Sequence, residues 1–359
     1  MTTVSGILQI TDLDRSFVNV VGQQVVYQAI QQYLLDHNTA LQEAMSLFVG
    51  GTTEKFKYRF KLAGGGYLQL RGGQATSGAM KSYGSWDVAL PLLDFGAQFG
   101  GDDITLAYMS MAELDLHMAT ITAQNVNTVR LEVLKALLDS TSYTFSDPIN
   151  GSLSVVPLAN GDSVTFPPVV GSDSEATDNH YLESNYATAS ISNTNNPFKT
   201  IRAELIEHFG GPQQGGENIL VVINSGATSY VEALTDFVPL QDRFTAPGQD
   251  TATLLGLPRV PGRIIGRCNG CWVSEWDWLP ANYAYGQHLD FTPPLEMRTD
   301  PADTGLPRGL ALVATSDAHP LVSSHYRNRF GMAVVNRLNG VVMEFGTGGT
   351  YTVPTGYSH

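Results

Sequence analysis

Charged residues are scarce in this chain of 359 residues, since Asp, Glu, Lys and Arg together make up only 15% of it, against about 25% in ordinary globular domains. A subunit covered by neighbours on several sides needs few charges, and so does a glycine-rich β protein; the chain has 36 glycines. The 34 acidic residues exceed the 20 basic ones and give a net charge of -14. Because proteins that grip nucleic acid neutralise phosphates with Lys and Arg, this balance argues against nucleic-acid binding as the main task.

Long apolar runs are also missing. No segment approaches the ~20 apolar residues that span a bilayer. The first residues, MTTVSGILQITDLDRS, lack the basic and apolar regions of a secretory signal. We therefore expect no membrane contact and a protein that stays in the cytoplasm where it is made. With 43% hydrophobic residues, the chain can still bury a large core.

Cysteine is nearly absent. The two cysteines, Cys268 and Cys271, form one CxxC in RCNGCWVSEW. A structural zinc site needs four ligands, and no second CxxC or HxxxH lies at a suitable spacing. We interpret the pair as buried, inert thiols and keep a redox pair as the alternative.

Motifs of catalysis, metal binding and nucleotide binding are missing as well. The segment 73–81 begins like a phosphate loop but has Ala79 where the lysine belongs, and no GxSxG elbow accompanies a histidine and an acid. Asp300 and Asp303, in TDPADTGLP, are typical of turns rather than of a catalytic carboxylate pair. No histidine has a partner at metal-ligand spacing; those considered are His117, His180, His319 and His325. We therefore expect no enzyme, no cofactor and no metal site.

What the chain does contain is a strict alternation in residues 54–73, EKFKYRFKLAGGGYLQLRGG. Period-two alternation puts cations on one face of a strand and apolar side chains on the other, and the glycines at 64–66 permit a tight reversal into a second strand at 67–70. A two-stranded hairpin is marginal alone, so its apolar face must cover another surface. The alternating residues are Lys55, Phe56, Lys57, Tyr58, Arg59, Phe60 and Lys61.

Helical spacing is clear in two segments. Residues 20–48 predict one amphipathic helix or two in line. Ser110 and Glu113 form a capping box that starts a helix to about Asp139. One face of this helix is marked by Met111, Leu114, Met118, Ile121, Val126, Val129, Val133 and Leu137, and a second stripe by Leu131, Leu134 and Leu138.

The remaining segments predict short elements. After the tip of the 51–100 excursion, WDVALPLLDFG returns as a strand, and a strand pair follows in TYTFSD and GSLSVVPLANG. A helix runs from Pro197 to Gly210, and ENILVVINSG is a buried strand. Further strands are expected in residues 262–291, and Leu338-Asn339-Gly340 is predicted to be a hairpin turn. The fold class is α+β.

In the order of these elements, the chain resembles the major capsid proteins of tailed phages of the Hong Kong 97 (HK97) type. The stretches YGSWDVALPLLDFG, WLPANYAYGQHLDF and RTDPADTGLPRGLALVA are similar to phage capsid sequences of this kind. The resemblance covers nearly the whole chain and implies an HK97-like capsid fold. Its parts would be an N-terminal arm (1–50), an extended β-hairpin E-loop (51–100), a peripheral domain (101–160 and 316–359) with the spine helix 110–139, and an axial domain (161–315).

The resemblance implies a structural major capsid protein that self-assembles as hexamers and pentamers into an icosahedral shell around double-stranded phage DNA. It implies a virion location after assembly in the host cytoplasm. The partners would be a scaffolding protein, a portal and a decoration protein, with DNA enclosed without sequence-specific binding. Because the arm follows Met1 directly, we expect a separate scaffolding protein or none, in place of a cleaved pro-region.

In this family the E-loop lies across the neighbouring subunit, so the residues from Lys55 to Lys61 would form an inter-subunit contact, with the basic face on an acidic neighbour. Some family members also crosslink covalently. Here Lys81, Asn336 or Asn339, and Glu344 could be named for that reaction, but glycine-flanked lysines and turn asparagines are common for ordinary reasons. We expect no crosslink.

Two other interpretations remain open. One is an encapsulin-type compartment shell protein of the same fold, which would enclose cargo protein instead of DNA. The other is an enzyme with its site in residues 161–315, around Cys268 and Cys271 or around His319 and His325. An enzyme would behave as a small oligomer in size-exclusion chromatography, whereas a shell protein would form very large particles.

Overall fold

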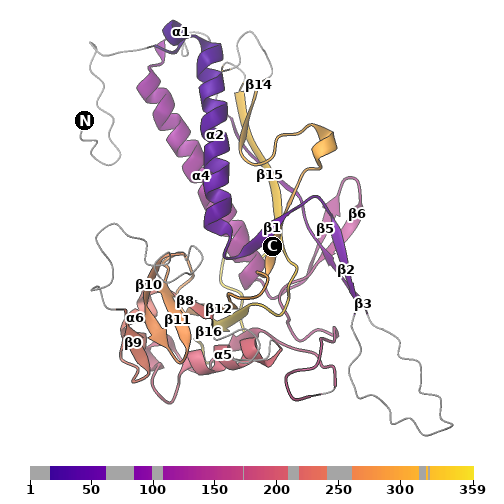
Figure 1. Ribbon diagram of the computed structural model, residues 1–359, viewed down its shortest axis with the longest axis vertical. Helices are drawn as coiled ribbons and strands as arrows, with labels where there is room; N and C mark the ends of the chain where they lie inside the picture. The colour runs from indigo at the N-terminus through magenta and orange to yellow at the C-terminus, as the bar shows by residue number, and fades with distance from the viewer. Residues whose placement is uncertain are drawn as a thin grey trace, which may run out of the picture. The chain divides into compact units, whose positions relative to one another are not determined.

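The computed structural model describes residues 17–61, 85–98, 108–172, 174–208, 218–240, 261–314, 321 and 324–359. The chain divides into two compact units (Figure 1). Unit 1 consists of Met1–Glu43, Leu92–Glu132 and Thr299–Gly331; unit 2 consists of Ala44–Pro91, Val133–Arg298 and Met332–His359. Neither unit is continuous in sequence, because the chain passes between them several times.

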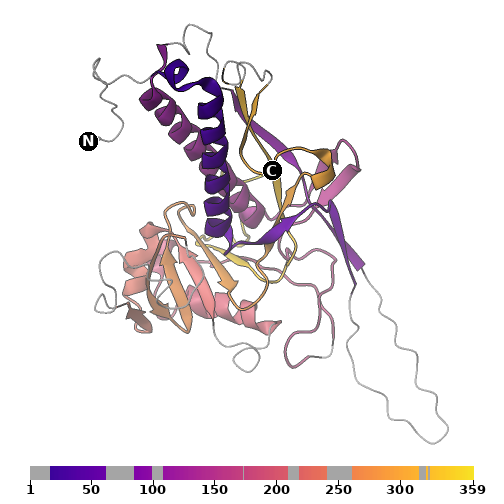
Figure 2. The same cartoon turned by 45° about the horizontal axis from the view of Figure 1, so that its top comes forward.

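Unit 1 contains two long helices that lie side by side in both views (Figures 1 and 2). A short helix, α1 (Val18–Val21), is separated from α2 (Gln23–Met45) by Gly22, whose φ of 97° is a conformation that suits glycine. Of the two predicted alternatives, one helix or two, the structure has two. The apolar side of α2 packs against α4 (Met111–Leu138). The shared core includes Val26, Ile30, Leu34, Leu114, Met118 and Ile121.

Helix α4 begins at the predicted capping box. The Ser110 backbone N–H donates to Glu113 Oε2 over 2.9 Å, and the Glu113 N–H donates to Ser110 Oγ over 3.3 Å. The helix has 28 residues, which corresponds to a length of about 42 Å. Its main apolar stripe is buried or half-buried throughout, as predicted. In the second stripe, Leu134 and Leu138 are buried, but Leu131 is 39% exposed, so the prediction is wrong there.

The strands of unit 1 centre on β15 (Ser324–Val334), which runs antiparallel to both β4 (Leu93–Gln98) and β14 (Ala311–Ala314). Tyr326 of β15 lies opposite Ala97 on one side and Leu312 on the other. The same tyrosine reaches the core that α2 and α4 share. A 3-10 turn, η4 (Ala302–Thr304), precedes β14.

Unit 2 contains a seven-stranded mixed sheet in the order β7-β16-β12-β8-β11-β10-β9. Its central strand β8 is buried at every position, as its apolar sequence predicts. The strands are β7 (Tyr181–Glu183), β8 (Ile219–Ile223), β9 (Phe237–Pro239), β10 (Arg263–Cys268), β11 (Cys271–Glu275), β12 (Tyr283–His288) and β16 (Val341–Glu344).

Helices α5 (Pro197–Glu207) and α6 (Ser225–Glu232) pack on this sheet, and a 3-10 turn, η1 (Thr188–Ser190), precedes them (Figure 1). The Asn196 side chain caps α5 by accepting from the Phe198 N–H, which confirms the predicted helix start. α5 approaches β12 so closely that a Cβ on Gly286 would lie 2.3 Å from Ile201 Cγ2. A glycine is therefore required at this crossing.

The remaining strands of unit 2 either belong to the five-stranded sheet that also contains β15 or form two separate pairs. β1 (Val49–Thr53) runs parallel to β13 (Leu295–Thr299). β5 (Tyr143–Asp147) and β6 (Gly151–Val155) form the predicted antiparallel pair. β2 (Lys57–Lys61) pairs with β3 (Ser85–Ala89).

The prediction of a hairpin turn at Leu338-Asn339-Gly340 is wrong. β15 pairs with β4 and β14, whereas β16 pairs with β7 and β12, so the two strands that flank this segment do not pair with each other. Asn339 is fully buried. Its Oδ1 accepts from the His288 N–H over 2.9 Å, and its Nδ2 donates to the His288 carbonyl over 3.0 Å. The Asn339 side chain therefore binds the backbone at the end of β12 and does not form a hairpin turn.

No helix in the described part of the chain is long and apolar enough to cross a membrane.

Strand β16, from the last segment of the chain, lies in the sheet otherwise formed by residues 181–288. The boundaries assigned to a peripheral and an axial domain remain predictions.

Candidate subunit-contact site

The predicted contact residues lie on the antiparallel pair β2–β3. Lys57 lies opposite Ala89, and Lys61 opposite Ser85. The strand 57–61 therefore pairs with Ser85–Ala89, which includes the start of the predicted return strand at Trp86. The predicted tight turn at 64–66 and the strand at 67–70 lie outside the described residues.

The basic face of β2 is exposed, as the alternation predicts, but part of its charge is neutralised within the chain. Arg59 donates to both carboxylate oxygens of Asp87, with Nε to Oδ1 at 2.7 Å and Nη2 to Oδ2 at 3.0 Å. Lys57 Nζ lies 2.5 Å from Oδ2 of the same carboxylate. The hydrogen bonds from Arg59 and Lys57 hold the pKa of the Asp87 carboxyl well below its usual range. The single negative charge of Asp87, on the facing strand, thus offsets one of the two positive charges of Lys57 and Arg59.

The apolar face of β2 is half-buried against its own chain. The Phe60 ring stacks on Trp86 with centroids 5.5 Å apart, and Trp86 meets Phe166 edge-on at 5.7 Å. The Tyr58 hydroxyl donates to Glu296 Oε2 over 2.7 Å. Phe56, at 40% exposed, is the apolar member that protrudes most. These contacts within the chain cover Tyr58 and Phe60 in part, and the contact with a neighbouring subunit stays a prediction.

Other apolar side chains are exposed on α1 and α2, where the sequence predicted no site. Val20 is 80% exposed, and Val25 and Leu35 are each 58% exposed. These residues lie outside the buried stripe of α2. The sequence signal for them was the nearly uncharged polar face of residues 20–48. Single exposed apolar side chains are common on protein surfaces, so these three do not by themselves mark a contact site.

The cysteines lie where inert thiols are expected. Cys268 and Cys271 pair across β10 and β11, on either side of a turn formed by Asn269 and Gly270, which have φ values of 49° and 85°. Both thiols are fully buried. Burial raises the pKa of the Cys268 thiol, which disfavours the thiolate that redox chemistry needs.

The other residues considered for chemistry are dispersed. Asp300 is buried, and it accepts a hydrogen bond from Arg329 Nη1 over 2.8 Å instead of facing Asp303 across a site. His325 is exposed on β15. The phosphate-loop segment 73–81 and His319 lie outside the described residues.

Among the described residues named for a crosslink, the side chains make other hydrogen bonds within the chain. Lys81 lies outside the described residues. The Asn339 amide is buried and donates to the carbonyls of His288 and Thr292. Asn336 Nδ2 donates to the Thr292 carbonyl over 3.0 Å. Glu344 accepts from the Thr352 N–H over 2.6 Å.

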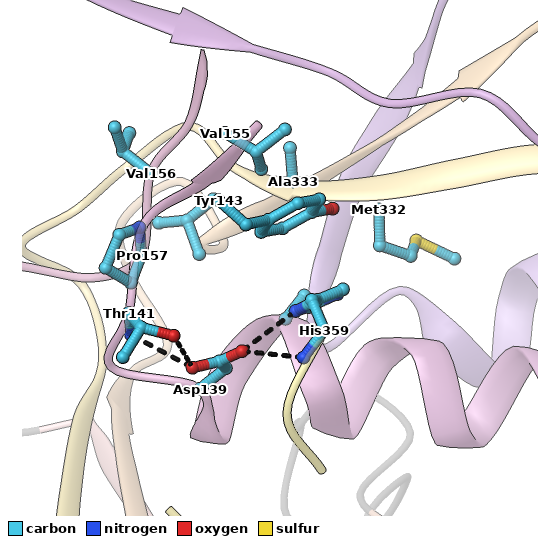
Figure 3. Close-up of a pocket in the computed structure, with 11 residues that line it drawn as sticks. Asp139, Thr141, Tyr143, Val155, Val156, Pro157, Met332, Ala333 and His359 are labelled. Atoms are coloured by element: carbon cyan, nitrogen blue, oxygen red, sulfur yellow. Dashed lines mark hydrogen bonds and ion pairs between the residues drawn. The ribbon is translucent and has the colours of Figure 1, made fainter. Parts of the chain in front are cut away.

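Two hollows among the described residues are small. The one in Figure 3, beside the end of α4, has a volume of about 10 Å³, room for about one water. There Asp139 Oδ2 accepts from the backbone N–H of His359 at 2.9 Å and lies 3.2 Å from its Nδ1 (Figure 3). Burial would raise the pKa of Asp139, but the bonds from His359 and Thr141 outweigh it and lower the pKa to about 2. Another hollow, beside Phe95 and Ile121, has about 140 Å³, below the ~300–1,000 Å³ of ligand pockets.

One cluster of chemical groups was missed by the sequence analysis, which expected no metal site. Asp178, His180, Glu207 and His208 bring four potential ligand atoms within 4.8 Å of one another. Burial opposes a charged Asp178, but the interactions with His180 and His208 prevail and hold the pKa of Asp178 below its usual range. The two halves of the cluster are far apart in sequence, and neither half matches a metal-binding motif.

Comparisons with known proteins give structural matches alone. No family model and no curated protein matches the chain. A solved structure from Mycobacterium phage Patience is similar over 99% of this chain and 98% of that one, with a TM-score of 0.67 and 20% identity. The mature capsid of bacteriophage PhiM1 (10% identity, 82% and 83% covered) and the capsid of cyanophage P-SCSP1u (9% identity, 96% and 92% covered) each match with a TM-score of 0.47, too low to support an argument.

The similarity to the Patience protein spans nearly the whole of both chains. The chain therefore has the fold of that phage protein. The fold is mixed α and β as predicted, and its similarity to a phage protein agrees with the predicted resemblance.

Proposed function

We propose that this chain is the major capsid protein of a tailed phage, which self-assembles into an icosahedral shell around double-stranded DNA. The observation that carries the proposal is the match to a phage protein over 99% of the chain. Its low content of charged residues, 15%, also suits a subunit that neighbours cover on several sides.

The parts of the HK97-type subunit can be assigned to the elements described above. The E-loop would be residues 51–100, and the antiparallel pairing of β2 with β3 supports this assignment because it makes the two ends of the excursion adjacent. Helix α4 would be the spine, and the sheet around β8 would be the axial domain. The location would be the virion, after assembly in the host cytoplasm with a scaffolding protein, a portal and a decoration protein.

The contact between subunits would use the exposed part of the β2–β3 pair. Tyr58 and Trp86 would hold the base of the arm on its own chain, through Glu296 and Phe166. Phe56 and the cations Lys55, Lys57, Arg59 and Lys61 would face a neighbour. Because the whole chain carries a net charge of -14, a basic strand is complementary to the acidic surface of another copy.

The protein would have no catalytic role, and the DNA would be enclosed without base recognition. An acidic inner wall suits this task, because like charges leave the packed DNA free to move. The small volumes of the hollows described above support a structural role.

Size-exclusion chromatography with light scattering on the full-length protein tests the proposal. We expect very large particles, or pentamers and hexamers that convert to such particles when a crowding agent is added. A stable monomer, dimer or tetramer under all conditions would contradict the shell function and favour an enzyme.

A further inference from the structure

We propose that Asp178, His180, Glu207 and His208 form a binding site for a divalent transition metal ion of the Zn²⁺ class. This site goes beyond the proposed shell function. Asp178 and His180 lie just before β7, whereas Glu207 is the last residue of α5 and His208 is its C-cap. The site would therefore join an edge of the seven-stranded sheet to the end of a helix in the same unit.

The protonation of both imidazole rings follows from their backbone partners. His180 Nδ1 lies 2.8 Å from the Gly340 carbonyl oxygen, and His208 Nδ1 lies 3.1 Å from the Pro167 carbonyl oxygen. A carbonyl oxygen can only accept, so each Nδ1 must carry the proton. In a neutral ring, Nε2 then carries a lone pair.

Both Nε2 atoms are directed at one carboxylate oxygen. Asp178 Oδ2 lies 2.7 Å from His180 Nε2 and 3.0 Å from His208 Nε2. The His180 side chain is fully buried, and its Nε2 has no hydrogen-bond partner of acceptable geometry among the described residues. With neutral rings, two lone pairs beside an anionic oxygen repel one another, and a cation between them would remove this repulsion.

The donor set and its surroundings select the kind of cation. Imidazole nitrogen and carboxylate oxygen are ligands of Zn²⁺, with bonds of about 2.0–2.2 Å that place tetrahedral ligand atoms about 3.3 Å apart. Three separations in the cluster, at 2.7 Å, 3.0 Å and 3.6 Å, lie around this value, and all four ligand atoms lie within 4.8 Å of one another. Histidines that bind a metal through Nε2 usually donate Nδ1–H to a carbonyl or carboxylate, which both histidines do here.

Access and coordination indicate a structural site. Glu207, whose side chain is 33% exposed, lies at the open side, whereas the side chain of His208 is 6% exposed. Four protein ligands complete a tetrahedral ion and leave no position for a substrate. A bound ion would thus hold the segment before β7 against α5 without supplying chemistry.

The test uses the untagged full-length protein, treated with EDTA, dialysed and then titrated with Zn²⁺ at pH 7.5. We expect one Zn²⁺ per chain by mass spectrometry of metal content, a rise in the thermal unfolding midpoint, and a visible spectrum of tetrahedral type with Co²⁺. His208→Gln should weaken Zn²⁺ binding by at least tenfold. His325→Gln removes an exposed histidine outside the cluster and should bind like the wild type.

Protons are the competing occupant, because two imidazolium rings could each donate Nε2–H to Asp178. In that case the wild type and His208→Gln would bind equally little Zn²⁺, and the unfolding midpoint would depend on pH but not on Zn²⁺ or EDTA. This result would overturn the proposal. If His208→Gln fails to fold, Glu207→Gln, on the open side of the cluster, takes its place in the titration. Weakened Zn²⁺ binding by this variant would support the site. Unchanged binding would show that Glu207 is not a ligand and would contradict the proposed four-ligand site.

Discussion

Helix α4 and the strand pair β2–β3 both carry a regular apolar pattern, but they differ in what covers it. The stripe of α4 is covered within the chain, with Leu114 and Met118 each 5% exposed and Val129 2% exposed. On β2, Tyr58 and Phe60 are only half-buried, Phe56 protrudes, and every basic residue is exposed. The comparison separates a region that maintains the fold from one that is available for contact with another copy.

The largest effect is expected on the buried side of this comparison. Leu114→Asp or Val129→Asp should prevent soluble folding, because an unpaired buried charge costs several kcal/mol against a total stability of about 5–15 kcal/mol. Leu116→Asp is the matched control, because Leu116 lies on the same helix but is 52% exposed. Soluble yield and circular dichroism measure the outcome. If the two buried variants assemble like the control, α4 is not packed as described.

The next effect concerns assembly at the exposed strand pair. Reversing Lys57 and Arg59 to Glu alone would also repel Asp87 within the chain, so the test variant combines both changes with Asp87→Arg. This swap preserves the ion pairs of the hairpin but reverses its outward charge. We expect a normal circular dichroism spectrum and no shells, because about 1 kcal/mol of repulsion per contact is repeated around the particle.

The single variant Asp87→Asn provides the comparison, since it leaves the cations in place and should still assemble. Phe56→Ala tests the apolar protrusion with little effect on the monomer. Intact shells from both the charge swap and Phe56→Ala would show that β2–β3 does not contact a neighbour.

A smaller effect is expected from acid at the C-terminal end of α4. The pKa of Asp139 is lowered from 3.8 to about 2, so its charged form stabilises the folded state above pH ~4, and this contribution is lost as the pH falls toward 2. The loss corresponds to about 2 kcal/mol. Unfolding midpoints of wild type and Asp139→Asn, measured from pH 6 to pH 2, should converge as the pH falls. A difference that does not change with pH would contradict the role of the carboxylate.

The smallest effect is expected at the other strand pair, β10–β11, whose cysteines are neutral and fully buried. Replacing both Cys268 and Cys271 with Ala should lower stability by about 1–2 kcal/mol and leave assembly intact. Differential scanning calorimetry and electron microscopy check this outcome. A wild-type protein whose assembly depends on oxidant, with that dependence removed in the variant, would instead support the redox pair.

The sequence predicted those features whose cause is local. Ser110 and Glu113 are three residues apart, so the start of α4 could be inferred from neighbours in sequence, and the alternation from Lys55 to Lys61 likewise predicted which side chains are exposed. The partner of β2 was harder, because β3 begins 24 positions after Lys61. A turn at the glycines, close in sequence, was the simpler prediction.

Features that depend on distant contacts were missed. His180 and His208 are 28 positions apart, and only the packing of α5 beside the sheet directs both rings at Asp178. Asn339 was assigned to a turn because asparagine and glycine favour turns, yet its side chain binds the backbone of His288. In both cases the identity of the residue was visible, but its partner was not.

The central claim is that copies of this chain form a closed shell, and electron microscopy of the purified full-length protein tests it most directly. The account predicts closed particles of uniform size, in which a reconstruction places the β2–β3 pair of one subunit against the surface of the next. A homogeneous population of small oligomers, with β2–β3 in contact with no other copy, would contradict it.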